Sequence, residues 1–170
     1  IENMELLEGI FTRRSVRDFT DEPVKREDLT EIMKAGTWAP SGMNNQPWRF
    51  ALIQNKNVLK QIATLTRYQH IIESAAACIA IFIDYNSSYD DVKDHLAVGA
   101  CIQNMLLATH ALGLGSVWIG EILKNSDKVR SLLDMPEDME LLAIIAIGHP
   151  AHRDQKSHRK NLSEILLKEV

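Results

Sequence analysis

A stretch near the N-terminus concentrates side chains that bind phosphate groups. Residues 13–17 (RRSVR) hold three guanidinium groups and a hydroxyl group within five positions. A guanidinium group carries a permanent charge and several N–H donors, which suit it to phosphate oxygens. The competing interpretation is a solvated basic corner at a helix end, where cations also interact favourably with the helix dipole. The spacing alone leaves both interpretations open.

A second basic stretch lies near the C-terminus. From His149 to Lys160, histidine, arginine and lysine side chains are opposed by one acidic residue, Asp154. This stretch is expected either to supply a second anion-binding group or to form a solvated basic loop. His149 and His152 are spaced like zinc ligands, but they lie in a proline-containing loop with neither cysteine near in sequence. We therefore expect no metal site.

A loop rich in amide groups lies between two prolines at residues 40–48 (PSGMNNQPW). Its side-chain amides, its hydroxyl group and its backbone N–H groups could hydrogen-bond a polar heterocycle. The competing interpretation is an ordinary connection from a helix to a strand, which is also rich in turn-forming residues.

Residues 113–121 (GLGSVWIGE) resemble a dinucleotide-binding fingerprint only superficially. Trp118 stands where the third glycine would fall, and the segment follows a helix where the fingerprint follows a strand. A Rossmann domain is therefore rejected. The sequence also lacks the Gly-x-Ser-x-Gly, HExxH, P-loop and kinase patterns, so no side chain is indicated as a nucleophile or metal ligand.

The elements that must position these groups are predicted from the spacing of apolar residues. We expect helices at residues 4–11, 26–35, 58–65, 91–112, 126–133 and 163–168. We expect strands at residues 48–54, 76–84, 116–119 and 141–147. Gly36 is expected to end the second helix. The fourth helix is apolar nearly all round, which predicts a central element or a subunit interface. The irregular order favours a mixed sheet covered by helices.

Length and composition are those of an ordinary globular domain. The chain has 170 residues, 45% of them hydrophobic and 25% charged, which predicts one domain over residues 1–170. Its net charge of −4 argues against general nucleic-acid binding. Cys78 and Cys101 lie in apolar runs and are expected to be buried thiols in a reducing compartment. We expect no signal peptide and no membrane span, and hence a cytoplasmic protein.

Four segments, taken together and in this order, resemble the nitroreductase family of FMN-dependent enzymes. They are RRSVRDF (13–19), APSGMNNQPWRF (39–50), HALGLGSVWIGE (110–121), and IGHP (147–150) followed by HRKNL (158–162). The similarity extends from about Met4 to Glu164, which is nearly the whole chain. It implies an α+β sandwich of the nitroreductase type, which is dimeric and has a central mixed, mainly antiparallel sheet flanked by helices.

The resemblance also implies which residues bind FMN. Those expected at the phosphate and ribityl chain are Arg13, Arg14, Ser15 and Arg17, with Arg159 or Lys160 adding to the phosphate site. Those expected in the loop that reaches the flavin of the other subunit are Pro40, Ser41, Asn44 and Gln46. Those expected beside the isoalloxazine are Trp118, Ile119, Gly120 and Glu121, with a backbone N–H near Gly120 facing flavin N5. A contact to the pyrimidine edge is expected within residues 67–70.

The implied activity is reduction of nitroaromatics, quinones or flavins by NADH or NADPH through a ping-pong mechanism at the flavin, without a catalytic side chain. FMN would lie at the interface of a homodimer, and a short segment, residues 85–92, is the candidate substrate lid. The alternatives are a specialised flavin enzyme of the same fold (a dehalogenase, an azoline oxidase or a flavin-fragmenting enzyme) and a non-catalytic FMN-binding redox sensor. A third alternative is an anion-binding domain without flavin.

Overall fold

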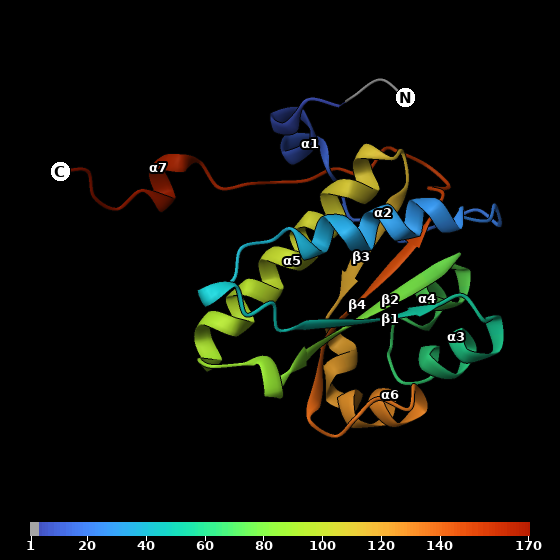
Figure 1. The fold of residues 1–170 in the computed structure, drawn as a ribbon. Helices are drawn as coiled ribbons and strands as arrows, with labels where there is room; N and C mark the ends of the chain where they lie inside the picture. Colours follow the sequence, from blue (N-terminus) through green and yellow to red (C-terminus); the bar gives the residue numbers. More distant parts are fainter. Residues whose placement is uncertain (1–3) are drawn as a thin grey trace.

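A four-stranded β-sheet forms the middle layer of the molecule (Figure 1). The computed structural model describes residues 4–170. The strands are β1 (Trp48–Ile53), β2 (Ala77–Asp84), β3 (Gly115–Ile119) and β4 (Met139–Gly148). Their order is β1-β2-β4-β3, and each neighbouring pair is antiparallel. A parallel bridge joins Ser15 to Ser116 at the β3 edge. The predicted mixed, mainly antiparallel sheet is confirmed.

Helices cover both faces of this sheet. The helices of the chain are α1 (Leu6–Thr12), α2 (Arg26–Thr37), α3 (Lys56–Ala63), α4 (Gln69–Ser74), α5 (Asp91–Ala111), α6 (Ser126–Leu132) and α7 (Leu162–Ile165), and five of them cover the sheet. The helices α2 and α5 pack on one face, and α3, α4 and α6 on the other (Figure 1). Every predicted helix and strand is present within a few residues. The short helix α4 was not among them, and α7 is one turn that ends before the predicted residue 168.

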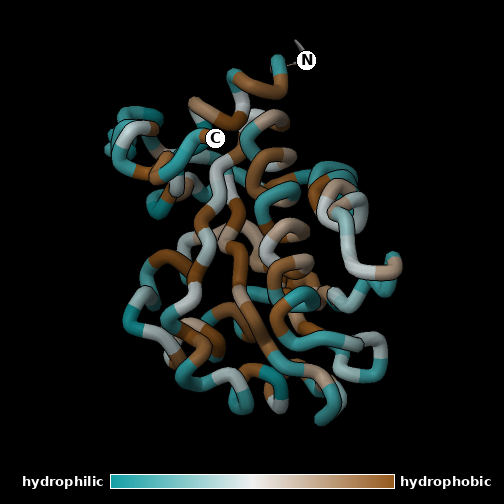
Figure 2. The backbone as a smooth tube through the Cα atoms, turned by 90° about the vertical axis from the view of Figure 1, so that its left-hand side faces the viewer, coloured by the Kyte–Doolittle hydropathy of each residue, from teal (hydrophilic) through white to brown (hydrophobic). Residues whose placement is uncertain are grey.

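The strand β2 is buried along its whole length because both faces of the sheet are covered. Ile79, Ile81 and Ile83 pack with α2 and α5, while Cys78, Ala80 and Phe82 pack with the helices of the other face. Figure 2 shows that hydrophobic residues gather in the interior of the molecule and hydrophilic residues in the connections at the periphery. Full burial of one such large apolar side chain stabilises the folded state by roughly 1.5–3 kcal/mol. Because both faces of β2 are buried, its sequence is a continuous apolar run and does not alternate between apolar and polar residues.

The prediction that Gly36 ends the second helix is wrong. The helix α2 continues through Gly36 to Thr37. A Cβ atom on residue 36 would lie 2.6 Å from Met105 Cε and 3.1 Å from Cys101 Sγ. Gly36 therefore allows α2 to approach α5 closely, and the packing of the two helices overrides its local tendency to end a helix.

Both cysteines are buried free thiols. Burial raises the pKa of Cys78 and of Cys101 to about 12, so both thiols stay protonated at neutral pH. Among the described residues, no helix has the length and apolar character that crossing a membrane requires.

After β4 the chain leaves the body of the molecule as an extended C-terminal segment, residues 151–170, which carries α7 (Figure 1). Nearly all its residues are exposed, including Leu162 at 74% and Leu167 at 91%. Its first half stays close to the N-terminal segment, beginning with the hydrogen bond from Ala151 N to Asp18 O.

Candidate functional site

The two basic stretches of the sequence meet at one cavity. Its volume is about 400 Å³. It is lined by Arg13, Arg14, Ser15, Arg17, Gln155, Lys156, Ser157 and Arg159. The structure thus brings together residues that are about 140 positions apart in the chain. Of the two C-terminal candidates, Arg159 lines this basic cavity and Lys160 does not.

The N-terminal half of the basic cavity is held against the edge of the sheet. Val16 N donates to Ser116 O at 3.0 Å, and the Val16 side chain is 7% exposed. A Cβ atom on Gly115 would lie 2.8 Å from Val16 Cβ, so a residue without a side chain is required at this approach. With Val16 turned into the core, the neighbouring Ser15 and Arg17 side chains line the cavity.

The C-terminal half is held by polar contacts to the same region. Arg153 Nη2 donates to Gly113 O at 2.6 Å. The His152 ring lies between two carboxylates, with Nε2 3.2 Å from Asp18 Oδ2 and Nδ1 in contact with Asp154 Oδ1. Hydrogen bonds to Asp154 and to Asp18 raise the pKa of His152, since both favour its charged form.

The electrostatics of the basic cavity call for an anion. Burial, together with repulsion from Arg159 and Arg14, lowers the pKa of Arg13. The Nε atoms of Arg13 and Arg14 are buried and have no hydrogen-bond partner within residues 4–170. A buried donor without a partner costs about 1–3 kcal/mol, and more when it is charged. A phosphate group in the cavity would offset the repulsion among the guanidinium groups that line it.

A second cavity of about 230 Å³ adjoins the first through Arg17, which lines both. It is lined by Arg17, Tyr68, Ile71, Val117, Trp118, Ile119, Gly120 and Glu121. The Trp118 side chain is 44% exposed there, although its neighbours in β3 are buried. The two cavities together form a surface with a cationic end and a partly apolar end, as a phosphorylated planar heterocycle requires.

Glu121 does not project freely into this second cavity. Its Oε2 atom accepts hydrogen bonds from Thr66 Oγ1 at 2.6 Å and from Arg67 N at 3.1 Å, and Oε1 pairs with Lys124. These contacts, chiefly the one to Lys124 and then the one to Thr66, lower the pKa of Glu121 to about 2. The Glu121 carboxylate thereby ties the turn before α4 to the end of β3.

The turn that Glu121 holds carries two further polar side chains. Arg67 Nη2 donates to Tyr68 Oη at 2.8 Å, and the guanidinium carbon lies 4.9 Å from the centroid of the Tyr68 ring. Within the predicted range of residues 67–70, Tyr68 is the residue that lines the second cavity.

The amide loop, residues 40–47, lines neither of these two cavities. Met43, Asn44 and Gln46 have φ angles of 52°, 55° and 47°, the left-handed region that few non-glycine residues adopt. Ser41 Oγ accepts from Gln46 N at 3.0 Å, and Gln46 Nε2 donates to Asn44 O at 3.2 Å. Pro40, which begins the loop, is exposed.

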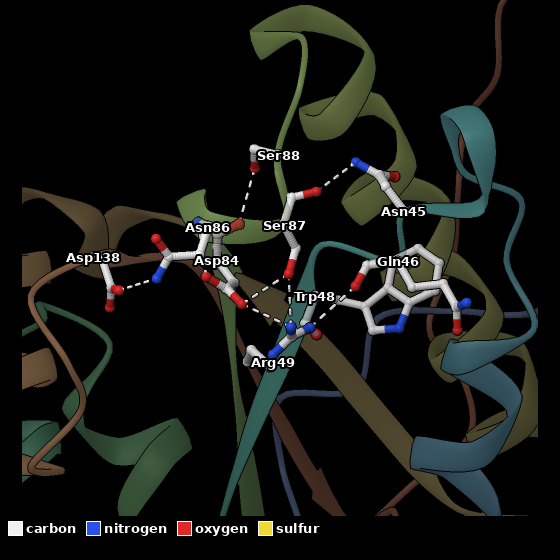
Figure 3. Close-up of polar contacts among 9 residues, drawn as sticks. All are labelled: Asn45, Gln46, Trp48, Arg49, Asp84, Asn86, Ser87, Ser88 and Asp138. Carbon is white, nitrogen blue, oxygen red and sulfur yellow. Dashed lines mark hydrogen bonds and ion pairs between the residues drawn. The ribbon is translucent and has the colours of Figure 1, made fainter.

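Side chains outside the amide loop brace it (Figure 3). Arg49 Nη1 donates to Gln46 O at 3.0 Å, and Arg49 Nη2 pairs with the Asp84 carboxylate at 2.7 Å. Asn45 Nδ2 donates to Ser87 O at 2.9 Å. This bracing was not predicted from the sequence, because Arg49 and Asp84 lie in two different predicted strands and no pattern indicates that they pair.

Within one chain the amide loop and the basic cavity are at opposite ends of α5. Asn45 contacts Asp94 in the first turn of α5, whereas Thr12, next to Arg13, contacts His110 in the last turn. The 21 residues of α5 span about 30 Å. The predicted loop residues and the predicted phosphate residues therefore do not come together in one protomer.

Apolar side chains along α1, α2 and α5 remain exposed. Leu6 is 71% exposed, Trp38 80% and Leu96 70%. A groove of about 350 Å³ runs between these helices and is lined by Met4, Glu5, Leu6, Gly9, Ala35, Trp38, Asn104, Leu107, Ala108 and Ala111. Contiguous apolar surface of this kind marks an interaction site. The helix α5 was expected to be a central element or a subunit interface, and it combines a side buried against the sheet with this exposed apolar surface.

Residues 4–170 contain no group of three or more histidine, cysteine, aspartate or glutamate side chains placed to hold a metal ion. His149 and His152, the two residues with zinc-like spacing, instead face Glu22 and Asp18 respectively.

Comparison with known proteins gives a consistent result. The model of the nitroreductase family matches residues 10–67 and 63–149. A curated relative, the FMN reductase [NAD(P)H] of Bacillus subtilis, is 32% identical over 173 residues, covering 91% of this chain and 70% of that protein. A protein of Archaeoglobus fulgidus, named for NADH dehydrogenase and NAD(P)H nitroreductase activity, is 34% identical over 158 residues, covering 89% and 88% of the two chains.

Solved structures share the fold. A protein of Desulfovibrio desulfuricans, described as a nitroreductase and crystallised with FMN, superposes with a TM-score of 0.92 at 45% identity, covering 96% of each chain. The NADPH:FMN oxidoreductase of Vibrio harveyi in complex with NAD⁺ superposes with a TM-score of 0.87 at 27% identity, covering 96% of this chain and 76% of the other.

Proposed function

This chain belongs to the nitroreductase family, and from that premise we propose that it binds FMN between two copies of itself and uses NAD(P)H to reduce a small electron acceptor. One observation carries the proposal: the basic cavity, lined by four arginines, continues through Arg17 into the cavity at the end of β3. A phosphate at one end and a flavin ring at the other satisfy both surfaces.

The cofactor-binding residues follow from this arrangement. In the proposal, the Arg13, Arg14, Arg17 and Arg159 guanidinium groups and the Ser15 hydroxyl group hold the phosphate and ribityl chain, and Lys160, which does not line the cavity, contributes only charge. Trp118, Ile119, Gly120 and Glu121 lie beside the ring system, and the Gly120 backbone N–H is the proposed donor to flavin N5.

A homodimer completes the site. Because about 30 Å of helix separates the amide loop from the basic cavity of the same chain, the loop can serve only a cofactor held mainly by another copy. A two-fold symmetric pair brings the loop of each chain to the cavity of the other. The exposed apolar surface along α1, α2 and α5 supports such a pairing. Pro40, Ser41, Asn44 and Gln46 are then the loop residues that contact the second copy's cofactor.

FMN supplies the redox chemistry when bound, since it can accept a hydride from a nicotinamide and pass electrons to a second substrate. The residues of the chain bind and orient. The arginine cluster fixes the phosphate end, the end of β3 presents backbone donors, and the amide loop supplies neutral hydrogen bonds. Nitroaromatics, quinones and flavins are the proposed acceptors, and the reaction order is ping-pong.

A cytoplasmic location belongs to the same proposal. It is supported by Cys78 and Cys101, which are buried and unpaired, as is usual for proteins in a reducing compartment.

Absorption spectroscopy tests the proposal directly. We expect the purified protein to show a flavin spectrum that is bleached anaerobically by NADPH or NADH. A flavin spectrum that persists with both donors would favour a redox sensor or a specialised flavin enzyme. A colourless protein that cannot be reconstituted with FMN would overturn the assignment. Elution as a monomer that still retains FMN would contradict the shared site.

A further inference from the structure

Asp94, in the first turn of α5, is a buried carboxylate that the proposed chemistry leaves without a role. Its side chain is fully buried and forms no ion pair with a lysine or arginine of the described residues. Burying a carboxylate is costly unless hydrogen bonds compensate it. The hydrogen-bond donors that contact Asp94 therefore indicate what the residue does.

Three N–H groups from two separate segments point at this carboxylate. Asn45 Nδ2, in the amide loop, donates to Oδ1 at 2.7 Å. The backbone N–H groups of Tyr89 and Asp90 donate to Oδ2 at 2.8 and 2.9 Å. Burial alone would raise the pKa of Asp94, but these hydrogen bonds outweigh it and hold the pKa below its usual value. Asp94 is thus a charged acceptor that joins the amide loop to the segment before α5.

The amide loop needs such a fixed point. Met43, Asn44 and Gln46 all have positive φ, and Asn45 lies among them in the ordinary right-handed region. A non-glycine residue held in the left-handed region costs on the order of 1 kcal/mol or more and persists only where its surroundings impose it. The Asn45 side chain is the group of this strained stretch that reaches outward, to Ser87 O and to Asp94 Oδ1.

The segment expected to be a substrate lid, residues 85–92, is part of the same support. Tyr85 and Asn86 contact Glu140 and Asp138, and Ser87 Oγ donates to Asp84 Oδ2 at 3.0 Å. The Tyr89 ring lies directly against Gly42 of the amide loop. This segment is anchored at both ends, so it braces the loop.

We propose that Asp94 is the positioning residue that holds the amide loop, through Asn45, in the conformation that contacts FMN of the second copy. The inference rests on the proposed function, because it assumes that the loop contacts FMN. Asp94 itself touches neither cofactor nor substrate. Its effect on the loop passes through the hydrogen bond to Asn45, while its two backbone hydrogen bonds fix the carboxylate itself to the segment before α5.

FMN titration of the dialysed apoprotein tests this role. Asp94→Asn keeps the shape of the side chain but turns an amide NH₂ toward either Asn45 Nδ2 or the two backbone N–H groups. We expect the dissociation constant of FMN to rise about tenfold, and the visible circular dichroism of the bound flavin to change. The matched control is Asp91→Asn, which removes the same charge from the same helical turn at a position whose side chain is 83% exposed. It is expected to leave both readouts unchanged.

Asn45→Ala provides a second route that does not depend on how Asp94→Asn folds. It is also expected to weaken FMN binding, and in its background Asp94→Asn should add little, because the connection to the loop is already broken. Unchanged FMN affinity in Asn45→Ala or in folded Asp94→Asn would overturn the role of Asp94, as would additive effects in the double variant. If the unmodified protein itself binds no FMN, the proposed function fails instead.

Discussion

The two ends of α5 carry two differently built halves of the proposed site. At its C-terminal end, guanidinium groups of like charge crowd around Arg13 and line the basic cavity. At its N-terminal end, the amide loop is hydrogen-bonded to itself and to Arg49, Ser87 and Asp94, although Asn45 Oδ1 is buried without a partner within residues 4–170.

This difference shows two ways of preparing a surface for one ligand. An anion bound in the basic cavity stabilises the folded protein, because it offsets the repulsion among the guanidinium groups. The amide loop is ordered in advance by its braces, so that little conformational entropy remains to be lost on binding. A change in the cavity should therefore affect ligand affinity alone, whereas a change in the loop should affect both affinity and folding.

The largest expected effect is that of Arg17→Ala on cofactor binding. Arg17 lines both cavities, and losing a charged hydrogen-bond donor should weaken FMN binding by about 1.5–3 kcal/mol, roughly one to two orders of magnitude in Kd. The thermal stability of the apoprotein should not fall, since one of several crowded cations is removed. Flavin fluorescence titration and calorimetry measure the two quantities. Unchanged affinity would remove Arg17 from the site.

Gly42→Ala should show the opposite pattern in the loop. A Cβ atom on residue 42 would lie 1.9 Å from Tyr89 Oη, so the ring must move and the brace must loosen. We expect the free energy of unfolding of the apoprotein to fall by about 1–3 kcal/mol. We also expect FMN binding to weaken. Chemical denaturation of the apoprotein measures the first effect. A variant as stable as the unmodified protein would show that the Tyr89 contact does not support the loop.

The smallest expected effect concerns the pH dependence of the C-terminal segment. The pKa of His152 is raised by Asp154 and Asp18, so its contribution to stability is fully present below its unfolded value of 6.5 and is lost as pH rises through the higher folded value. Limited proteolysis of the apoprotein should cut residues 151–170 faster above this range than below it. In His152→Gln the rate of cleavage within residues 151–170 should no longer depend on pH over this range. Equal dependence in both proteins would exclude His152 as the titrating group.

The sequence predicted the elements well where burial is uniform and less well where contacts are specific. The apolar run that became β2 and the apolar helix α5 could be read directly from the sequence, because their neighbours need only be hydrophobic. The packing role of Gly36 could not be predicted from the sequence, since it depends on Met105 and Cys101, which pack against it from α5.

The candidate site divides in the same way. The basic residues on both sides of the cavity were apparent from composition, and the choice of Arg159 over Lys160 required the path of the chain. The partners of Glu121 and Asp94 were not predicted. A single acidic residue carries no pattern, and the partners that link each carboxylate to a distant segment, Thr66 for Glu121 and Asn45 for Asp94, lie 55 and 49 positions away.

The buried thiols give the molecule a built-in probe of its own opening. Cys78 lies in the central strand β2, and Cys101 lies where α5 packs against α2. An alkylating reagent can reach either sulfur only while the surrounding structure is open, so the rate of modification reports the population of open states. Equal rates at the two positions would mean that both helix-covered faces of the sheet come apart together. A faster rate at Cys101 would mean that the α2–α5 layer can lift while the strands stay paired.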